Sequence, residues 1–274
     1  MTIFISIQSK GGPGSGNWGH RGIPGKVGGS SPGGSGVVGV TLKPLSYKER
    51  LDLLTYDGKR YIGMDERVKL KAEVVDDIAT RSGLSKADVN YTMEKWAGTA
   101  NDTDLDALSL QETAAELFGL ELSDWQTGNL AHFAGRSSQR LTKDQQKRFL
   151  TAMYDNTQSR LKELVGDSRS ITVYRGYLDE SLELDAMKGD SIRLGTSPLS
   201  SWSLDEDIAR KFMGDAVVYE SQSFLFRATI PLKSIISTSI TGMGAFSEKE
   251  VVSIGNAFDV NVEEQFEPYA DGGW

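Results

Sequence analysis

Residues 171–176 read ITVYRG, and this stretch marks a change in the character of the chain. Ile, Thr, Val and Tyr favour β-strands, and a glycine after such a run is typical of a strand end. On the C-terminal side further short β-rich segments follow, whereas on the N-terminal side the apolar residues recur at helical spacing. We therefore place the boundary between a helical half and a β-rich half near residue 168.

The β-rich half is predicted to be mainly antiparallel. Its strand-like segments follow one another closely, and the only helix expected among them is a short one from Asp205 to Met213. Parallel neighbours need crossover connections of a dozen or more residues, which this spacing does not provide. The predicted fold class is therefore α+β. The remaining strand-like segments are SIRLG, SSWSL, VVYESQSFLFRATI and VVSIGNAFDVNVEE.

Helix start signals divide residues 46–166 into about six predicted helices. A Ser, Thr or Asp side chain caps the amide groups of the first turn, and a Glu or Gln three residues later completes a capping box. The start signals are Ser46 with Glu49, Asp65, Ser85, Ser109 with Glu112, Ser123, and Thr142 with Gln145. The expected apolar faces contain Val68, Leu70, Val74, Val75 and Ile78, then Val89, Met93 and Trp96, then Phe149, Met153 and Leu161.

The segment 1–45 is expected to lie outside the folded core. Residues 11–36 are so rich in Gly, Ser and Pro that chain entropy should exceed any gain from burial, which predicts a linker. The GxGxxG match at Gly14–Gly19 has no strand before it, so we do not interpret it as a dinucleotide site. Within the linker, NWGHRGIPGKVGGS resembles a stretch that recurs in head-associated proteins of tailed phages. This similarity favours a virion or prophage origin.

Composition excludes several kinds of site. The 274-residue chain has a net charge of −8 at pH 7, which argues against a general nucleic-acid-binding protein. No apolar run of about 18 residues occurs, so no membrane span is expected, and we recognise no export signal. Because cysteine is absent, disulfides, zinc–thiolate sites and thiol nucleophiles are excluded, and the compartment is undetermined. Two histidines are too few for a histidine metal cluster, so no metal is expected.

Three short motifs in the β-rich half contain candidate functional residues. Arg175 ends an apolar strand and Gly176 follows it, which suits bidentate recognition of a phosphate but is also typical of a surface ion pair. Ser201 and Ser203 would share one face of an extended segment, where they could equally act as a helix cap and a turn former. Phe212 lies in the short helix that follows.

The third motif is Glu248-Lys249-Glu250, where the last strand region begins. In an extended chain alternate side chains share a face, so the two glutamates would lie together with Lys249 on the other side. Either water screens the two like charges on a strand face, or each acid has its own task. The preceding STSITGMGAFS, residues 237–247, is expected to be an exposed loop with Phe246 at its tip.

In this order, the three motifs resemble the arginine, serine and glutamate triad of the mono-ADP-ribosyltransferases, in the branch with R, S-x-S and E-x-E motifs. The resemblance covers residues of about 145–265 and includes AMYDNTQSRLKELVG, FLFRATIPLKSII and an A-x-x-F pattern at Ala209 and Phe212. Trp202 departs from the family, in which a small residue is common between the serines. The resemblance implies two packed, mainly antiparallel sheets with NAD bound in a cleft between them.

The resemblance also implies roles for individual residues. Glu250 would hydrogen-bond the ribose 2′-hydroxyl and stabilise an oxocarbenium-like transition state. Arg175, with Gly176 beside it, would bind the NAD pyrophosphate or the adjoining ribose. Ser201 would hold Glu250 and the ribose on the nicotinamide side in position. Ser203 and Phe212 are assigned to the NAD site as well, Phe212 facing the nicotinamide ring or, as an alternative, packing in the core against Ile208.

The acceptor is expected to be an arginine of a target protein. In the family, glutamate at the position of Glu248 accompanies arginine acceptors, because a guanidinium must be oriented and then relieved of a proton. Phe246 would contact the target. The predicted division is a segment 1–45, a helical region 46–166 and a catalytic β-rich core 167–274 on which the helix 142–166 packs. The alternatives are an NAD glycohydrolase, transfer to nucleic acid, and a phage head-associated structural protein without activity.

Overall fold

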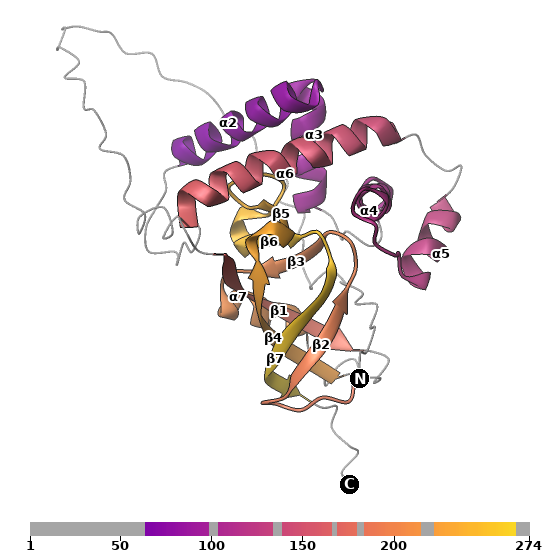
Figure 1. Cartoon of the computed structure of the whole chain (residues 1–274), viewed down its shortest axis with the longest axis vertical. Coiled ribbons are helices and arrows are strands. Elements are labelled where there is room, and N and C mark those ends of the chain that lie inside the picture. Colours follow the sequence, from indigo (N-terminus) through magenta and orange to yellow (C-terminus); the bar gives the residue numbers. More distant parts are fainter. Residues whose placement is uncertain are drawn as a thin grey trace, which may run out of the picture.

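The computed structural model describes residues 64–98, 104–133, 139–165, 169–179, 184–214 and 222–266. Its architecture is α+β, with the helices followed by an antiparallel sheet, as the sequence predicts (Figure 1). The linker 11–36 and the helix expected after Ser46 lie outside the described residues. Among the described helices, none combines the length and the apolar character that crossing a membrane requires.

Five helices make up the described part of the helical region, and most of their predicted start signals are confirmed. The hydroxyl oxygens of Ser85, Ser123 and Thr142 accept hydrogen bonds from backbone amides three residues later, at 3.1, 3.1 and 3.4 Å. Each of these residues therefore caps the helix that follows it. The helices are α2 (Met64–Ser82), α3 (Lys86–Gly98), α4 (Leu105–Phe118), α5 (Asp124–Phe133) and α6 (Lys143–Val165).

The start predicted at Ser109 is wrong. Helix α4 begins at Leu105, and its cap is Asp104, whose carboxylate accepts bonds from the amides of Asp106 and Ala107. Ser109 is buried inside the helix and hydrogen-bonds Gln146 of α6. A polar residue on the inward face of a helix therefore produced the same S-x-x-E pattern as a true cap. Val68, predicted to lie on an apolar face, is 63% exposed.

Seven strands form one sheet in the order β2-β7-β4-β1-β3-β6-β5, and every neighbouring pair is antiparallel. The short helix α7 (Glu206–Arg210) and the 3-10 turn η1 (Lys211–Met213) lie between β3 and β4, as predicted, with Asp205 as the cap. The strands are β1 (Ser170–Asp179), β2 (Ser191–Thr196), β3 (Ser200–Ser203), β4 (Gln222–Pro231), β5 (Ile235–Thr238), β6 (Glu250–Ser253) and β7 (Asn256–Phe266), with 3-10 turns η2 (Leu232–Ser234) and η3 (Phe246–Glu248).

A second sheet, expected from the family resemblance, is not present as a separate sheet in the described residues. Strands β1 and β3 are joined by one registered pair, Tyr174 opposite Ser203. By contrast, β1 and β4 pair along ten positions. This narrow junction divides the sheet into a four-stranded part, β2-β7-β4-β1, and a three-stranded part, β3-β6-β5.

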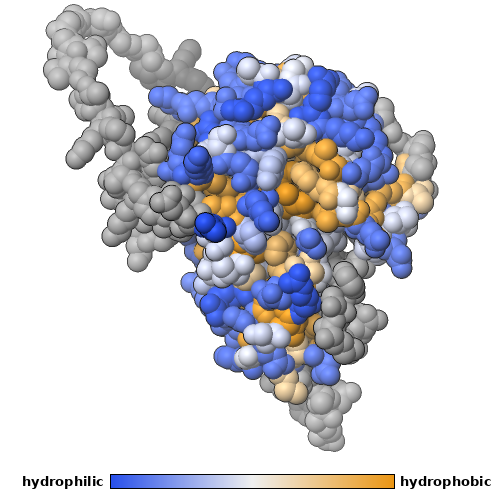
Figure 2. All heavy atoms as spheres, in the orientation of Figure 1, coloured by the Kyte–Doolittle hydropathy of each residue, from blue (hydrophilic) through white to orange (hydrophobic). Residues whose placement is uncertain are grey.

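One hydrophobic core, here called the helix–sheet core, lies between the helices and the three-stranded part. Helix α6 contacts β5, and α2, α3 and α4 complete the cover (Figure 1). Figure 2 shows hydrophilic side chains over α2 and α6 and hydrophobic ones in the band where the helices meet the sheet. The main members are Val74, Ile78, Val89, Met93, Trp96, Leu110, Phe149, Met153, Leu199, Ile236, Met243 and Val252.

A second core, here called the sheet core, lies mainly on the four-stranded part. The rings of Phe224 and Phe226 stack with centroids 5.6 Å apart, and the ring of Trp202 meets Phe258 edge-on. Neighbouring residues of β6 separate the two cores, since Val251 belongs to the sheet core and Val252 to the helix–sheet core. Other members of the sheet core are Leu161, Val173, Leu194, Ile230, Ile235, Val260 and Val262.

Candidate active site

The structure brings Arg175, Ser201 and Glu250 together. A guanidinium nitrogen of Arg175 donates to the backbone oxygen of Ser201 at 2.9 Å, and the Ser201 hydroxyl donates to Oε1 of Glu250 at 2.5 Å. These residues come from β1, β3 and β6, so the cluster lies across the narrow junction of the sheet. Arg175 is 7% exposed and Glu250 is 3% exposed. Residues of the three motifs therefore form one polar cluster, in which Arg175 and Glu250 are buried and Ser201 is half-buried.

Strand register explains why the serine reaches the glutamate. In the antiparallel pair β3–β6, Ser203 is opposite Glu250 and Ser201 is opposite Val252. Ser201 and Glu250 are thus diagonal neighbours, and diagonal side chains on one face of an antiparallel pair are within reach of each other. Trp202 lies between the serines, donates its indole N–H to Ser253 Oγ at 3.2 Å and is buried in the sheet core. The large residue in the S-x-S motif is accommodated on the opposite face.

Three donors surround the Glu250 carboxylate. Oε1 accepts from Ser201 and from the indole Nε1 of Trp96, the latter at 3.3 Å, and Oε2 accepts from the backbone amide of Ala245 at 2.6 Å. Burial raises the pKa of Glu250, whereas the three hydrogen bonds and the charge of Arg175 act in the opposite direction. Burial is the largest of these effects, so the pKa of Glu250 stays above its usual value, and the donors reduce that shift.

The loop that supplies the Ala245 amide is buried, so the prediction of an exposed loop with an aromatic tip is wrong. All residues from 235 to 245 are buried. Asn156 of α6 donates to the backbone oxygen of Thr241 at 2.7 Å, which anchors the loop to the helix. A Cβ on Gly244 would lie 2.6 Å from the Ser239 nitrogen and 2.9 Å from the Glu250 oxygen, so the tight turn requires glycine there.

The E-x-E motif is a turn and not an extended segment. Glu248 ends η3, Lys249 has a left-handed backbone with φ of 47°, and β6 begins at Glu250. Burial and the nearby charge of Glu250 raise the pKa of Glu248 to about 7. The two acids therefore influence each other, but the left-handed residue, and not strand alternation, sets their relative position.

Lys249, predicted to lie on the other side from the two glutamates, is also buried. Its ammonium group pairs with Asp205 at 2.5 Å. The Ser203 hydroxyl donates to the backbone oxygen of Glu248 at 2.8 Å and accepts from the Asp205 amide at 3.0 Å. Ser203 therefore uses its hydroxyl within the protein, where it joins the start of α7 to the E-x-E turn.

The other three candidate residues lie around this cluster. A Cβ on Gly176 would be 2.1 Å from the Ala209 oxygen, so α7, and not a ligand, makes the close approach to this backbone. Phe212 is on η1 and is 38% exposed. Phe246 is half-buried and lines a cavity of about 100 Å³ with Met93 and Met243.

Sequence reasoning missed Trp96, the Ala245 amide and the Lys249–Asp205 pair. Trp96 was predicted only as an apolar residue of its helix, which it also is, being 2% exposed. No local signal links it to Glu250, which is 154 positions away. An indole that is buried has an N–H that needs a partner, and this requirement is the one sequence-level hint available.

This arrangement is suited to stabilising positive charge near a buried carboxylate. A guanidinium, a hydroxyl, a buried carboxyl group whose pKa is raised, and a second acid with a pKa of about 7 lie close together. Within the described residues, no group of three or more His, Cys, Asp or Glu side chains is placed to hold a metal ion. A scan against models of protein families finds no match to this chain, and neither curated protein sequences nor solved structures yield one.

Proposed function

We propose that this chain is a mono-ADP-ribosyltransferase that transfers ADP-ribose from NAD to an arginine of a target protein and releases nicotinamide. The observation that supports this most is the convergence of Arg175, Ser201 and Glu250, which are 26 and 49 positions apart along the chain. A solvated strand face or a surface ion pair would leave these side chains exposed and apart. Here Arg175 and Glu250 are buried and the half-buried Ser201 contacts both, which favours a common task.

In the proposed reaction, the bond between the ribose C1′ and the nicotinamide nitrogen breaks, and nicotinamide leaves with the electron pair. The ribose acquires oxocarbenium character, and the Glu250 carboxylate stabilises this charge more in the transition state than in bound NAD. Ser201 and the Ala245 amide hold that carboxylate in place. Preorganised charge of this kind often accounts for a large share of a rate enhancement.

Arg175 is proposed to bind the pyrophosphate of NAD. A guanidinium has five N–H donors in a planar fork, and the bond to the Ser201 backbone fixes the direction of one of them. Arg175 is on β1, in the four-stranded part, while Ser201 and Glu250 are in the three-stranded part. In this proposal the two parts correspond to the two sheets of the family, and the dinucleotide extends across their junction.

Glu248 is proposed to orient the acceptor arginine and to take its proton as the guanidinium nitrogen bonds to C1′. A carboxylate with a pKa of about 7 is poised between both protonation states near neutral pH, as a general base requires. Glu250 is 3% exposed, and a site from which water is excluded would favour transfer to an acceptor over hydrolysis. Phe246, on the same 3-10 turn as Glu248, is proposed to contact the target protein.

The first test measures nicotinamide release from NAD by the purified protein. The Glu250→Gln variant keeps the shape of the side chain but loses its charge, and we expect release to fall by on the order of 100-fold or more. A folded wild-type protein that releases no nicotinamide would favour the structural alternative. Circular dichroism of both proteins confirms that the folds match.

The second test identifies the acceptor. Wild type is expected to transfer ADP-ribose to agmatine, a small arginine analogue, whereas Glu248→Gln is expected to release nicotinamide without this transfer. Labelling a bacterial lysate with tagged NAD then reveals the natural acceptor class. Label that resists protease and disappears with nuclease would show that nucleic acid, and not arginine, is modified, and mass spectrometry of a labelled protein band would identify the target.

A phage-borne or toxin-like origin is part of the proposal and rests on the segment NWGHRGIPGKVGGS alone, which lies outside the described residues. Its test is independent of catalysis. If the chain is virion-associated, antibodies against it should detect it in purified particles of the phage or induced prophage that encodes it.

A further inference from the structure

Helix α3 contributes a side chain to the candidate active site. Trp96 is in the last turn of α3, and its indole Nε1 donates to Oε1 of Glu250 at 3.3 Å. The indole is 2% exposed and belongs to the helix–sheet core with Val89 and Met93 of the same helix. The packing around the ring therefore fixes the direction of its N–H.

The other contacts of Glu250 show what this hydrogen bond does. A carboxylate oxygen has room for about two donors. Oε1 has two in the described structure, Ser201 and Trp96, whereas Oε2 has one, the Ala245 amide. Oε1 is thus saturated by the protein, and the remaining acceptor position of the carboxylate is on Oε2.

We propose that Trp96 is a positioning residue for Glu250, which saturates Oε1 so that Oε2 receives the hydroxyl of the substrate ribose. This inference rests on the proposed function and assigns a task to the helical region, which thereby completes the site that the strands build. Trp96 does not touch the reacting atoms in this scheme. It acts through the orientation and the ionisation of Glu250.

The ionisation of Glu250 also depends on the charged groups around it. Arg175 of β1 favours the ionised form of Glu250, and Glu248 of η3 is close enough for the charge of Glu250 to raise its pKa. Lys249, which directly precedes Glu250, is paired with Asp205. The indole N–H is a neutral donor that favours the ionised carboxylate without adding a charge.

The test compares two matched variants, Trp96→Phe and Trp202→Phe. Each deletes one buried indole N–H and keeps an aromatic ring, but the N–H partner of Trp96 is the Glu250 carboxylate and that of Trp202 is the Ser253 hydroxyl. The Arg175 guanidinium lies 5.9 Å from the centroid of the Trp202 ring, and phenylalanine keeps an aromatic face there. For Trp96→Phe we expect kcat for nicotinamide release to fall about ten-fold. KM for NAD should stay near the wild-type value, and the acid limb of the pH profile should move to higher pH.

Trp202→Phe is expected to lower stability to a similar extent and to leave the acid limb in place. If both variants keep the wild-type acid limb, Trp96 is only a core residue and the inference is wrong. That result is distinct from failure of the proposed function, in which wild type itself releases no nicotinamide.

A second measurement does not depend on activity and requires only that Trp96→Phe be folded at some temperature. In wild-type protein with ¹⁵N-labelled tryptophan, the Trp96 indole N–H resonance should move with pH as Glu250 ionises, and it should not titrate in Glu250→Gln. The resonance is assigned by its absence from the spectrum of Trp96→Phe, recorded at any temperature at which that variant is folded. An indole resonance that does not respond to Glu250 would overturn the inference.

Discussion

The helix–sheet core and the sheet core differ in what they hold together. The helix–sheet core joins α2, α3, α4 and α6 to one face of β5 and β6, whereas the sheet core lies mainly among β1, β2, β4 and β7. Strand β6 contributes to both, through Val252 and Val251. Glu250 is the first residue of that strand. The candidate site is thus built where the two cores meet.

Both cores extend across the predicted boundary near residue 168. A boundary near residue 168 follows the change from helix to strand, but the cores do not follow it. Helix α6 contributes Phe149 and Met153 to the helix–sheet core and Leu161 to the sheet core. The helical region and the sheet region therefore share their buried interior.

The largest loss of stability is expected when a large buried side chain is removed from either core. Phe149 and Phe224 are both 0% exposed, one in each core. Phe149→Ala and Phe224→Ala are each expected to lower the free energy of unfolding by about 3–5 kcal/mol. Because the cores share β5 and β6, both variants should shift one common transition, measured by circular dichroism and tryptophan fluorescence. Two separate transitions, each sensitive to one variant, would show that the regions unfold independently.

A smaller loss of stability is expected from a substitution where α7 packs on β1. In Gly176→Ala the new Cβ would lie 2.1 Å from the Ala209 oxygen, so α7 must move, at about 1–3 kcal/mol of stability. Gly128→Ala is the matched control, because Gly128 is in α5 and a Cβ there meets no atom within 4 Å. The control should be neutral or slightly stabilising, since alanine favours helices. Equal loss in both variants in chemical denaturation would contradict the contact between α7 and β1.

Glu248 is expected to make the stability of the protein depend on pH. Its pKa of about 7 is above that of an unfolded glutamate, so the folded state binds a proton more tightly, and its contribution to stability is lost as pH rises through 7. Glu248→Gln should therefore stabilise the protein more at pH 8 than at pH 5, as measured by urea unfolding. A stabilisation that does not change between these pH values would indicate that Glu248 is solvated.

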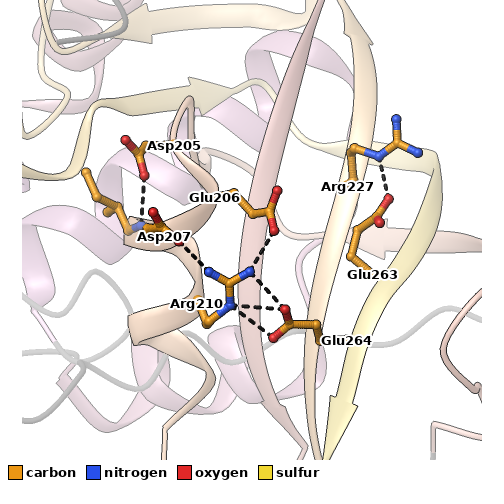
Figure 3. A network of polar contacts seen from close by, with 8 residues as sticks. Asp205, Glu206, Asp207, Arg210, Arg227, Glu263 and Glu264 are labelled. Atoms are coloured by element: carbon orange, nitrogen blue, oxygen red, sulfur yellow. Dashed lines mark hydrogen bonds and ion pairs between the residues drawn. The ribbon is translucent and has the colours of Figure 1, made fainter. Parts of the chain in front are cut away.

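The smallest loss of stability is expected when the ion pairs of Arg210 on α7 are removed. Arg210 bonds Glu264 of β7 through two nitrogens and also contacts Glu206 and Asp207 (Figure 3). The side chains of Arg210 and Glu264 are 36% and 25% exposed and Asp207 is 87% exposed, and ion pairs that water reaches contribute little. Arg210→Gln should lower the unfolding temperature less than any change above, and the difference should shrink in 1 M salt through screening. A loss as large as that of Gly176→Ala would show that this network, and not apolar packing, holds α7.

Local patterns predicted much of the described fold. Caps at Ser85, Ser123 and Thr142 are short-range signals, because the capping oxygen and the amide it binds are three residues apart. Ser109 shows the limit of such signals. Its hydroxyl serves a contact with Gln146 of another helix, which no window of neighbouring residues contains.

The buried turn before β6 was mispredicted for a related reason. Glycines and small polar residues at 237–247 resemble an exposed loop, but here Asn156 satisfies a loop carbonyl and the helices cover the segment. Polar residues are stable in a buried loop only when partners supply their hydrogen bonds. Those partners come from α6, about 85 positions earlier in the chain.

By itself, the sequence determined the α+β class, most helix starts, most of the strand segments and the residue types of the three motifs, because these follow from contacts between near neighbours. Only the tertiary structure decided that Arg175, Ser201 and Glu250 meet at the sheet junction, that Lys249 is buried and that Trp96 reaches the carboxylate. The physical reason is that strand pairing and core packing join segments far apart in the chain. The environment of each side chain, including the pKa of Glu248, is set by those distant neighbours.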